Sequence, residues 1–173
     1  FASTVLSRVV RMALGFHRVK VIGRGNIADV GIIVSNHVSL VDIVILQELA
    51  GAAFVAKAGV RQVPFVGTIA ASFGAIFVER TTAAANSKKN DSDSGSAAER
   101  IVRRLAEHKD GAAPLAVFAE GTTTNGRYIA KFHSGAFRAG VPVQPVLLDY
   151  CSNARFVPSF ESIPLTTFLF SLL

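Results

Sequence analysis

Residues 31–46 read GIIVSNHVSLVDIVIL and place one histidine and one aspartate between two aliphatic runs. The first run, GIIVS, is short and continuously apolar, which predicts a buried β-strand. The residues from Ser39 to about Ala50 predict a helix, because Ser39-Leu-Val-Asp42 has the pattern of a capping box. Capping explains Ser39 and Asp42, but it leaves His37 without a structural role.

The spacing of His37 and Asp42 is compatible with a catalytic pair. Residues five apart in one ideal helix differ by about 140°, so their side chains would not meet. If His37 instead lies in the turn before the helix, its ring can fold back and donate from Nδ1–H to Asp42. Nε2 then remains as a base, as in hydrolytic triads. The chain has no G-x-S-x-G sequence, so the pair suits a reaction in which a hydroxyl of the substrate attacks.

Strand-like and helical segments alternate along the rest of the chain. A second capping box, Ser96-Ala-Ala-Glu99, predicts a helix that continues to about His108. Such alternation is typical of an α/β domain, and we expect one domain over residues 1–173 with a largely parallel central sheet flanked by helices. The further strands are expected at residues 52–57, 74–80, 114–120 and 141–150, and a turn with a short helix at residues 59–72.

Two segments differ in composition from this predicted core. Residues 1–16 have helical periodicity, with one apolar half and one half that carries Ser7, Arg8 and Arg11. This helix either lies in a membrane interface or packs on the domain's own core. Residues 81–96 are rich in Ser, Asn, Asp and Lys and predict a flexible loop.

Charge and hydropathy narrow the classes of partner. The chain has 18 Lys and Arg against 12 Asp and Glu, an excess that fits either a solvated surface or an anionic partner such as phospholipid. Nucleic acid is disfavoured, since no basic run interleaves with aromatic residues. Half of the residues are hydrophobic, but turn-forming and charged residues interrupt every window long enough for a transmembrane helix. Because the chain begins with Phe1 and its one methionine is Met12, we expect a fragment of a longer, membrane-associated protein.

Four short segments, NHVSLVD, GAIFVER, FAEGT and VPVQPV, occur in this order within roughly residues 20–150. Together they resemble the four motifs of the glycerophospholipid acyltransferase family, and KAGVRQVPFVG resembles the segment before the family's second motif. Ala119 stands where the family usually has proline, which alters backbone stiffness before Glu120 but removes no reacting group. The turn EGTTTNGR is more similar to the branch that acylates lysophosphatidylcholine or lysophosphatidylethanolamine than to the lysophosphatidate branch.

The resemblance implies transfer of a fatty acyl group from acyl-CoA to the free hydroxyl of a lysophospholipid. The acceptor would be lysophosphatidylcholine, lysophosphatidylethanolamine or lysophosphatidate, and His37 would be the general base, oriented by Asp42. Because the thioester is already activated, we expect no metal and no cofactor beyond acyl-CoA as co-substrate. The expected partners are acyl-CoA, the lysophospholipid and a membrane surface, at the endoplasmic reticulum if the organism is eukaryotic.

The resemblance also implies roles for residues of the second and third motifs. Arg80 and the EGT turn would hold phosphate groups of the substrates, although Arg80 fits a surface ion pair as well. Glu120 would shape the acceptor site, or would be a strand-end carboxylate that satisfies backbone N–H groups. The N–H groups of Gly121 and Thr122 are candidate donors to the oxyanion that develops during transfer.

Two other classes of function remain open from the sequence. A lipid- or membrane-binding domain could keep the fold without activity, although it would have no need of His37, Asp42 and the EGT turn. A thioesterase or other hydrolase would use Cys151 or a serine as nucleophile beside His37, and no motif indicates one.

Overall fold

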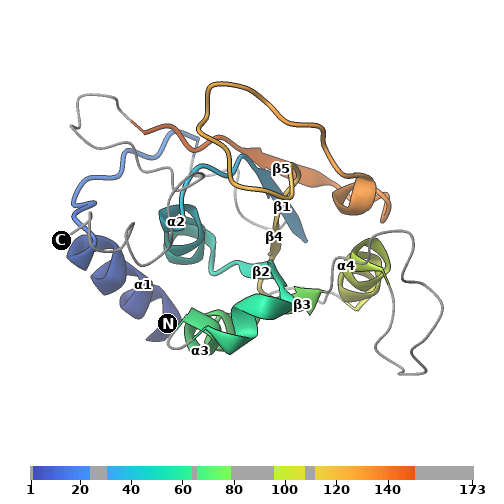
Figure 1. Ribbon diagram of the computed structural model, residues 1–173, viewed down its shortest axis with the longest axis horizontal. Coiled ribbons are helices and arrows are strands. Elements are labelled where there is room, and N and C mark those ends of the chain that lie inside the picture. The colour runs from blue at the N-terminus through green and yellow to red at the C-terminus, as the bar shows by residue number, and fades with distance from the viewer. Residues whose placement is uncertain (1, 24–30, 64–65, 79–95, 108–111, 151–173) are drawn as a thin grey trace.

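The computed structural model describes residues 2–23, 31–63, 66–78, 96–107 and 112–150. In these ranges five strands form one parallel sheet with helices on both faces (Figure 1), which confirms the predicted α/β class. The strands are β1 (Ile32–Ser35), β2 (Ala53–Lys57), β3 (Ile76–Val78), β4 (Leu115–Phe118) and β5 (Val143–Val146). The helices are α1 (Ala2–Ala13), α2 (Val41–Ala50), η2 (Ala58–Gln62), α3 (Val66–Ser72), α4 (Ala97–Ala106) and η3 (Ser134–Ala136).

The order of the strands across the sheet is β3-β2-β4-β1-β5, so β1 lies between β4 and β5. Ser35, the last residue of β1, is paired with Phe118 on one side and Val146 on the other. The carboxyl ends of these three parallel strands therefore lie side by side. That edge is where open parallel sheets bind their ligands.

Alternate residues of β1 face opposite sides of the sheet, as the period of a strand requires. Ile32 packs in one core with Ile101 and Leu105 of α4, and all three are buried. Ile33 packs in the other core with Leu46 of α2. The continuous apolar character of GIIVS thus reflects a strand that is covered on both faces.

The last strand is shorter than the predicted range of residues 141–150. β5 lies at the edge of the sheet and pairs with β1, and its Pro145 has no N–H to donate to a ladder. Residues 147–150 leave the strand and approach α2. Of the predicted loop at residues 81–96, only Ser96 lies in the described part of the chain, where it is the N-cap of α4 and completes the predicted capping box with Glu99.

Helix α1 packs against α2 on the side of α2 that faces away from the sheet (Figure 1). It does so with its polar half: Ser7 is fully buried and Arg11 is 5% exposed. The apolar half faces outward, with Val5 at 50% and Val9 at 58% exposure. None of the helices within the described ranges is long and apolar enough to cross a membrane.

Of the two arginines on the polar half of this helix, Arg11 is the one that lies in the interface with α2. Its Nε donates to Glu48 of α2 over 2.6 Å, and its Nη1 donates to the carbonyl of Phe16. Glu48 raises the pKa of Arg11 through this hydrogen bond, so the guanidinium stays charged. Arg8 does lie outside, with a side chain 70% exposed and its Nε 3.8 Å from Glu48. Glu48 of α2 therefore pairs with Arg11 inside the α1–α2 interface, whereas Arg8 stays on the surface.

Candidate active site

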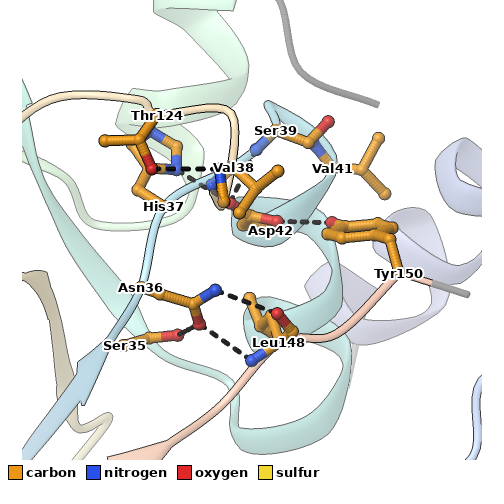
Figure 2. A network of polar contacts seen from close by, with 11 residues as sticks. Ser35, Asn36, His37, Val38, Ser39, Val41, Asp42, Thr124, Leu148 and Tyr150 are labelled. Carbon is orange, nitrogen blue, oxygen red and sulfur yellow. Dashed lines mark hydrogen bonds and ion pairs between the residues drawn. The ribbon is translucent and has the colours of Figure 1, made fainter. Parts of the chain in front are cut away.

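The turn after β1 is fixed by a side chain rather than by the sheet ladder. Asn36 donates from its side-chain amide to the carbonyl of Leu148 over 2.9 Å, and its carbonyl oxygen accepts from the Leu148 N–H over 2.8 Å. Figure 2 shows both bonds joining the end of β1 to the segment after β5. The chain can therefore leave the sheet at this point without losing hydrogen bonds.

His37 lies in the turn between β1 and α2, and its ring folds back over the start of the helix. Its Nδ1 is 2.9 Å from Oδ2 of Asp42 (Figure 2). The side chain of His37 is 15% exposed, whereas Asp42 is completely buried. The geometry predicted from the spacing of the two residues is thus present, and it leaves Nε2 as the ring nitrogen that Asp42 does not engage.

Asp42 also organises the backbone around the histidine. Its Oδ2 accepts from the N–H groups of Val38 and Ser39 over 2.7 and 2.8 Å. The hydroxyl of Ser39 in turn accepts from the N–H of Val41 over 3.2 Å. Only half of the capping box predicted at Ser39 is present, because the Ser39 hydroxyl accepts from Val41 and not from Asp42, and α2 has Leu40 as its N-cap with no side-chain cap. The bonds of Asp42 to the two backbone N–H groups and to His37 nevertheless tie this turn together through one carboxylate.

Sequence reasoning missed a further partner of this carboxylate. The hydroxyl of Tyr150 donates to Oδ1 of Asp42 (Figure 2). Burial, followed by the negative charge of Asp42, raises the pKa of Tyr150 far above its ordinary value, so the phenol stays protonated and remains a donor. No motif marks Tyr150, because its proximity to Asp42 depends on the pairing of β5 with β1.

The segment after β4 holds the other side of the histidine. The ring of Phe118 is stacked on the ring of His37, with centroids 3.9 Å apart and planes at 12°. The N–H of Thr124 donates to the carbonyl of His37 over 2.8 Å. The stack of Phe118 on His37 thus brings the first and third motifs into direct contact, although more than 75 residues separate them in the sequence.

The structure gives different results for the residues expected to bind substrate. Glu120 is 5% exposed and its carboxylate accepts from the N–H of Ala130 over 2.8 Å, as expected for a strand-end carboxylate. Gly121 has a φ of 64°, which favours glycine, and its N–H donates to the carbonyl of Phe118 over 2.9 Å. This N–H is therefore engaged in the turn, and our expectation that it would face an oxyanion is wrong.

The two remaining residues expected to bind substrate are placed differently again. Thr122 is exposed in the same turn as Gly121. Arg80 lies outside the described residues, so its role stays a prediction.

The polar groups around Asp42 do not form a metal site. Both carboxylate oxygens face N–H or O–H donors, and such donors would repel a cation. Elsewhere in the described ranges, no group of three or more His, Cys, Asp or Glu side chains is arranged to hold a metal ion.

A polar cavity of about 270 Å³ lies away from His37, between α1 and α2. Arg11 and Glu48 line it and already satisfy each other, and Arg8 and His17 lie at its wall. The cavity therefore belongs to the packing of α1, and the chemistry-bearing residues gather instead at the carboxyl ends of β1 and β4.

Comparison with known proteins gives a consistent result. Residues 18–149 match the Acyltransferase family. The chain is similar to the lysophospholipid acyltransferase LPEAT1 of Arabidopsis thaliana, with 41% identity over 77% of this chain and 32% of that protein. It is also similar to a lyso-ornithine lipid O-acyltransferase of Pseudomonas aeruginosa, with 39% identity over 68% of this chain and 42% of that protein. The chain thus spans well under half the length of these curated relatives.

A solved structure shares the fold. The 1-acyl-sn-glycerophosphate (LPA) acyltransferase PlsC of Thermotoga maritima superimposes with a TM-score of 0.60. The similarity covers 82% of this chain and 54% of that one, at 24% sequence identity. At this identity the likeness supports the arrangement of strands and helices, and it leaves substrate choice open.

Proposed function

Because the chain belongs to the Acyltransferase family, we propose that it transfers a fatty acyl group from acyl-CoA to the free hydroxyl of a lysophospholipid. The observation that carries this proposal is the contact between Nδ1 of His37 and the buried carboxylate of Asp42. We assign His37 as the general base and Asp42 as the group that orients it.

In the proposed reaction, Nε2 of His37 removes the proton from the acceptor hydroxyl while its oxygen attacks the thioester carbonyl carbon. The tetrahedral intermediate then breaks its carbon–sulfur bond, and the CoA sulfur leaves with the proton held on Nε2. A base placed in this way contributes about 10²- to 10⁴-fold in rate. Asp42 stabilises the imidazolium that forms between the two steps.

The surroundings of His37 support this assignment because they restrict its ring. Stacking on Phe118 and the hydrogen bond to Asp42 together fix the plane of the imidazole. Holding the base and the acceptor hydroxyl in the correct relative geometry contributes much of the rate of such a reaction.

We further propose that residues of the second and third motifs bind the polar parts of both substrates. Arg80 would pair with a phosphate of the acceptor or of CoA, since a guanidinium binds phosphate with two donors. Thr122 is exposed in the turn after β4 and would contribute to the same site. Glu120 would shape the acceptor site indirectly, because its carboxylate holds the N–H of Ala130 at the far end of that turn.

A membrane surface is the partner we propose for the exposed half of α1. Four apolar side chains on this helix are at least 45% exposed, and the substrate is itself an amphiphile. Burial of such a face in the lipid interface is favourable. We therefore propose that the protein is membrane-associated, at the endoplasmic reticulum if the organism is eukaryotic. The exposed face consists of Val5, Leu6, Val9 and Met12.

The test is release of CoA thiol from acyl-CoA with and without an acceptor. We expect release that depends on the acceptor, in a panel of lysophosphatidylcholine, lysophosphatidylethanolamine, lysophosphatidate and a lyso-ornithine lipid. Release without acceptor would instead identify a thioesterase, and no release in any condition would favour a lipid-binding domain.

The assay is repeated with His37→Ala and with His17→Ala as the matched control. Loss of the general base should lower the rate by at least about a hundredfold. His17 is exposed after α1, so its replacement should leave the rate unchanged. A folded His37→Ala protein with activity within a few-fold of the parent would refute the mechanism.

A further inference from the structure

Tyr150 approaches the start of α2 from the side opposite His37. It follows β5, and the two hydrogen bonds between Asn36 and Leu148 hold this segment against the end of β1. The ring of Phe16 packs edge-on against the ring of Tyr150, with centroids 5.9 Å apart and planes at 77°. The contact with Phe16 fixes the ring of Tyr150, and the bonds of Leu148 fix its backbone, so that the hydroxyl lies next to Asp42.

The two oxygens of Asp42 have different neighbours. Oδ2 is surrounded by three nitrogens, from His37, Val38 and Ser39, whereas Oδ1 receives the hydroxyl of Tyr150. The bond that turns a carboxylate group about its stem has a broad, soft energy profile. Donors on one oxygen alone would leave the group free to tilt, and a donor on the other oxygen opposes that tilt.

The phenol is also suited to this role by its chemistry. Burial and the charge of Asp42 keep its proton in place, as its raised pKa indicates. The phenol therefore remains a hydrogen-bond donor to Asp42, and it brings no charge that would compete with an imidazolium for Asp42. An arginine or lysine at the same place would neutralise the carboxylate and weaken its effect on His37.

We propose that Tyr150 is a positioning residue for acyl transfer, which acts on His37 through Asp42 and does not touch the substrate. The proposal rests on the proposed function of His37. It predicts that the hydroxyl of Tyr150 contributes to the rate of the chemical step and not to the binding of either substrate.

The first experiment measures kcat and KM of the intact protein carrying Tyr150→Phe. The ring and its contact with Phe16 remain, so the fold should be retained. We expect kcat to fall about ten- to a hundredfold, the usual range when an orienting partner behind a functional side chain is removed. KM for acyl-CoA and for the lysophospholipid should stay unchanged within error. Tyr128→Phe is the matched control, because it removes the same atom from the other tyrosine of the chain, which is 52% exposed.

The second experiment combines Tyr150→Phe with Asp42→Asn. If the phenol acts through the carboxylate, it should have little further effect once the carboxylate is gone, so the two losses should be strongly non-additive. A purely structural role in packing would give the same loss in both backgrounds.

Three results would overturn the proposal: an unchanged kcat in Tyr150→Phe, a raised KM with unchanged kcat, or additive losses in the double variant. The His37→Ala variant is measured alongside to separate the two levels of inference. Loss of activity in His37→Ala with normal activity in Tyr150→Phe would refute the role of Tyr150 alone. Full activity in His37→Ala would refute the proposed function itself.

Discussion

Helices α1 and α2 pack against each other, and each buries one charged side chain in a different way. Arg11 of α1 meets an opposite charge, Glu48, through two hydrogen bonds of 2.6 and 3.1 Å. Asp42 of α2 meets two backbone N–H groups, the imidazole of His37 and the phenol of Tyr150. The first charge is paired with an opposite charge, whereas the second is held in place by hydrogen-bond donors.

This difference separates a structural charge from one that can serve in catalysis. A buried ion pair is electrically complete and mainly determines how two elements pack. A buried carboxylate held by neutral donors is ready to stabilise a positive charge that appears beside it, such as an imidazolium. The variants below test whether Arg11 matters mainly for stability and Asp42 mainly for activity.

The largest effect is expected for Asp42→Asn. Removing the charge behind the histidine should lower kcat by about 10³- to 10⁴-fold, as in other histidine–aspartate pairs. The amide would also turn one N–H group toward a former donor, which should cost about 1–3 kcal/mol of stability. Steady-state kinetics and urea denaturation measure the two effects. A lower midpoint of unfolding with normal kcat would reduce Asp42 to a helix cap.

Arg11→Ala should show the opposite balance between stability and activity. It leaves Glu48 without its closest partner in the α1–α2 interface, and we expect a loss of about 3 kcal/mol in the free energy of unfolding. Arg8→Ala is the control on the same helix: its exposed pair should cost less than about 1 kcal/mol. Thermal denaturation of both variants checks this. Equal losses would mean that the buried pair is no stronger than the exposed one.

Replacement of the outer face of α1 should affect membrane binding rather than the fold. Val5→Glu with Val9→Glu should lower partition into anionic vesicles by at least about tenfold, since burying each valine contributes about 1.5 kcal/mol or more. Arg8→Glu alone should weaken binding less, and only at low salt, because salt screens exposed charges. Vesicle sedimentation measures both. Undiminished binding of the valine variant would exclude this face as the lipid contact.

The smallest effect is expected for Ser96→Ala at the start of α4. The variant removes the side-chain oxygen that accepts from the Glu99 N–H, at a cost of about 1 kcal/mol. Activity per folded molecule should not change, because α4 packs on the face of the sheet opposite to α2. Circular dichroism and the thiol-release assay report the two quantities. A loss of activity without a loss of stability would link α4 to the site.

The sequence allowed prediction of features that depend on neighbours along the chain. The strand at GIIVS, the turn at His37 and the helix that follows are each encoded by local pattern, and their geometry brings the histidine to the aspartate. The capping box at Ser96 is likewise local, and it is present as predicted. Five strands in a parallel sheet followed from the alternation of segments.

Features that depend on the order of strands or on packing between elements could not be predicted in this way. Tyr150 reaches Asp42 only because β5 lies beside β1, and nothing near residue 150 indicates that neighbour. The periodicity predicted α1 but left open which half faces the domain, and the contact of Arg11 with Glu48 of α2 places the polar half inward. The turn at Gly121 was identified, while the hydrogen bond of its N–H required the folded backbone.

The bonds from Asn36 to Leu148 and from Asp42 to Tyr150 join residues that are 112 and 108 positions apart. On the ribosome, the histidine and aspartate emerge long before the residues that complete their surroundings. Contacts of such long range form late, since the chain between them must first be ordered. A nascent chain that has not yet docked β5 lacks the Tyr150 donor to Asp42, and its turn lacks the backbone of Leu148. The surroundings of the proposed base are thereby completed only when the last strand of the sheet has docked.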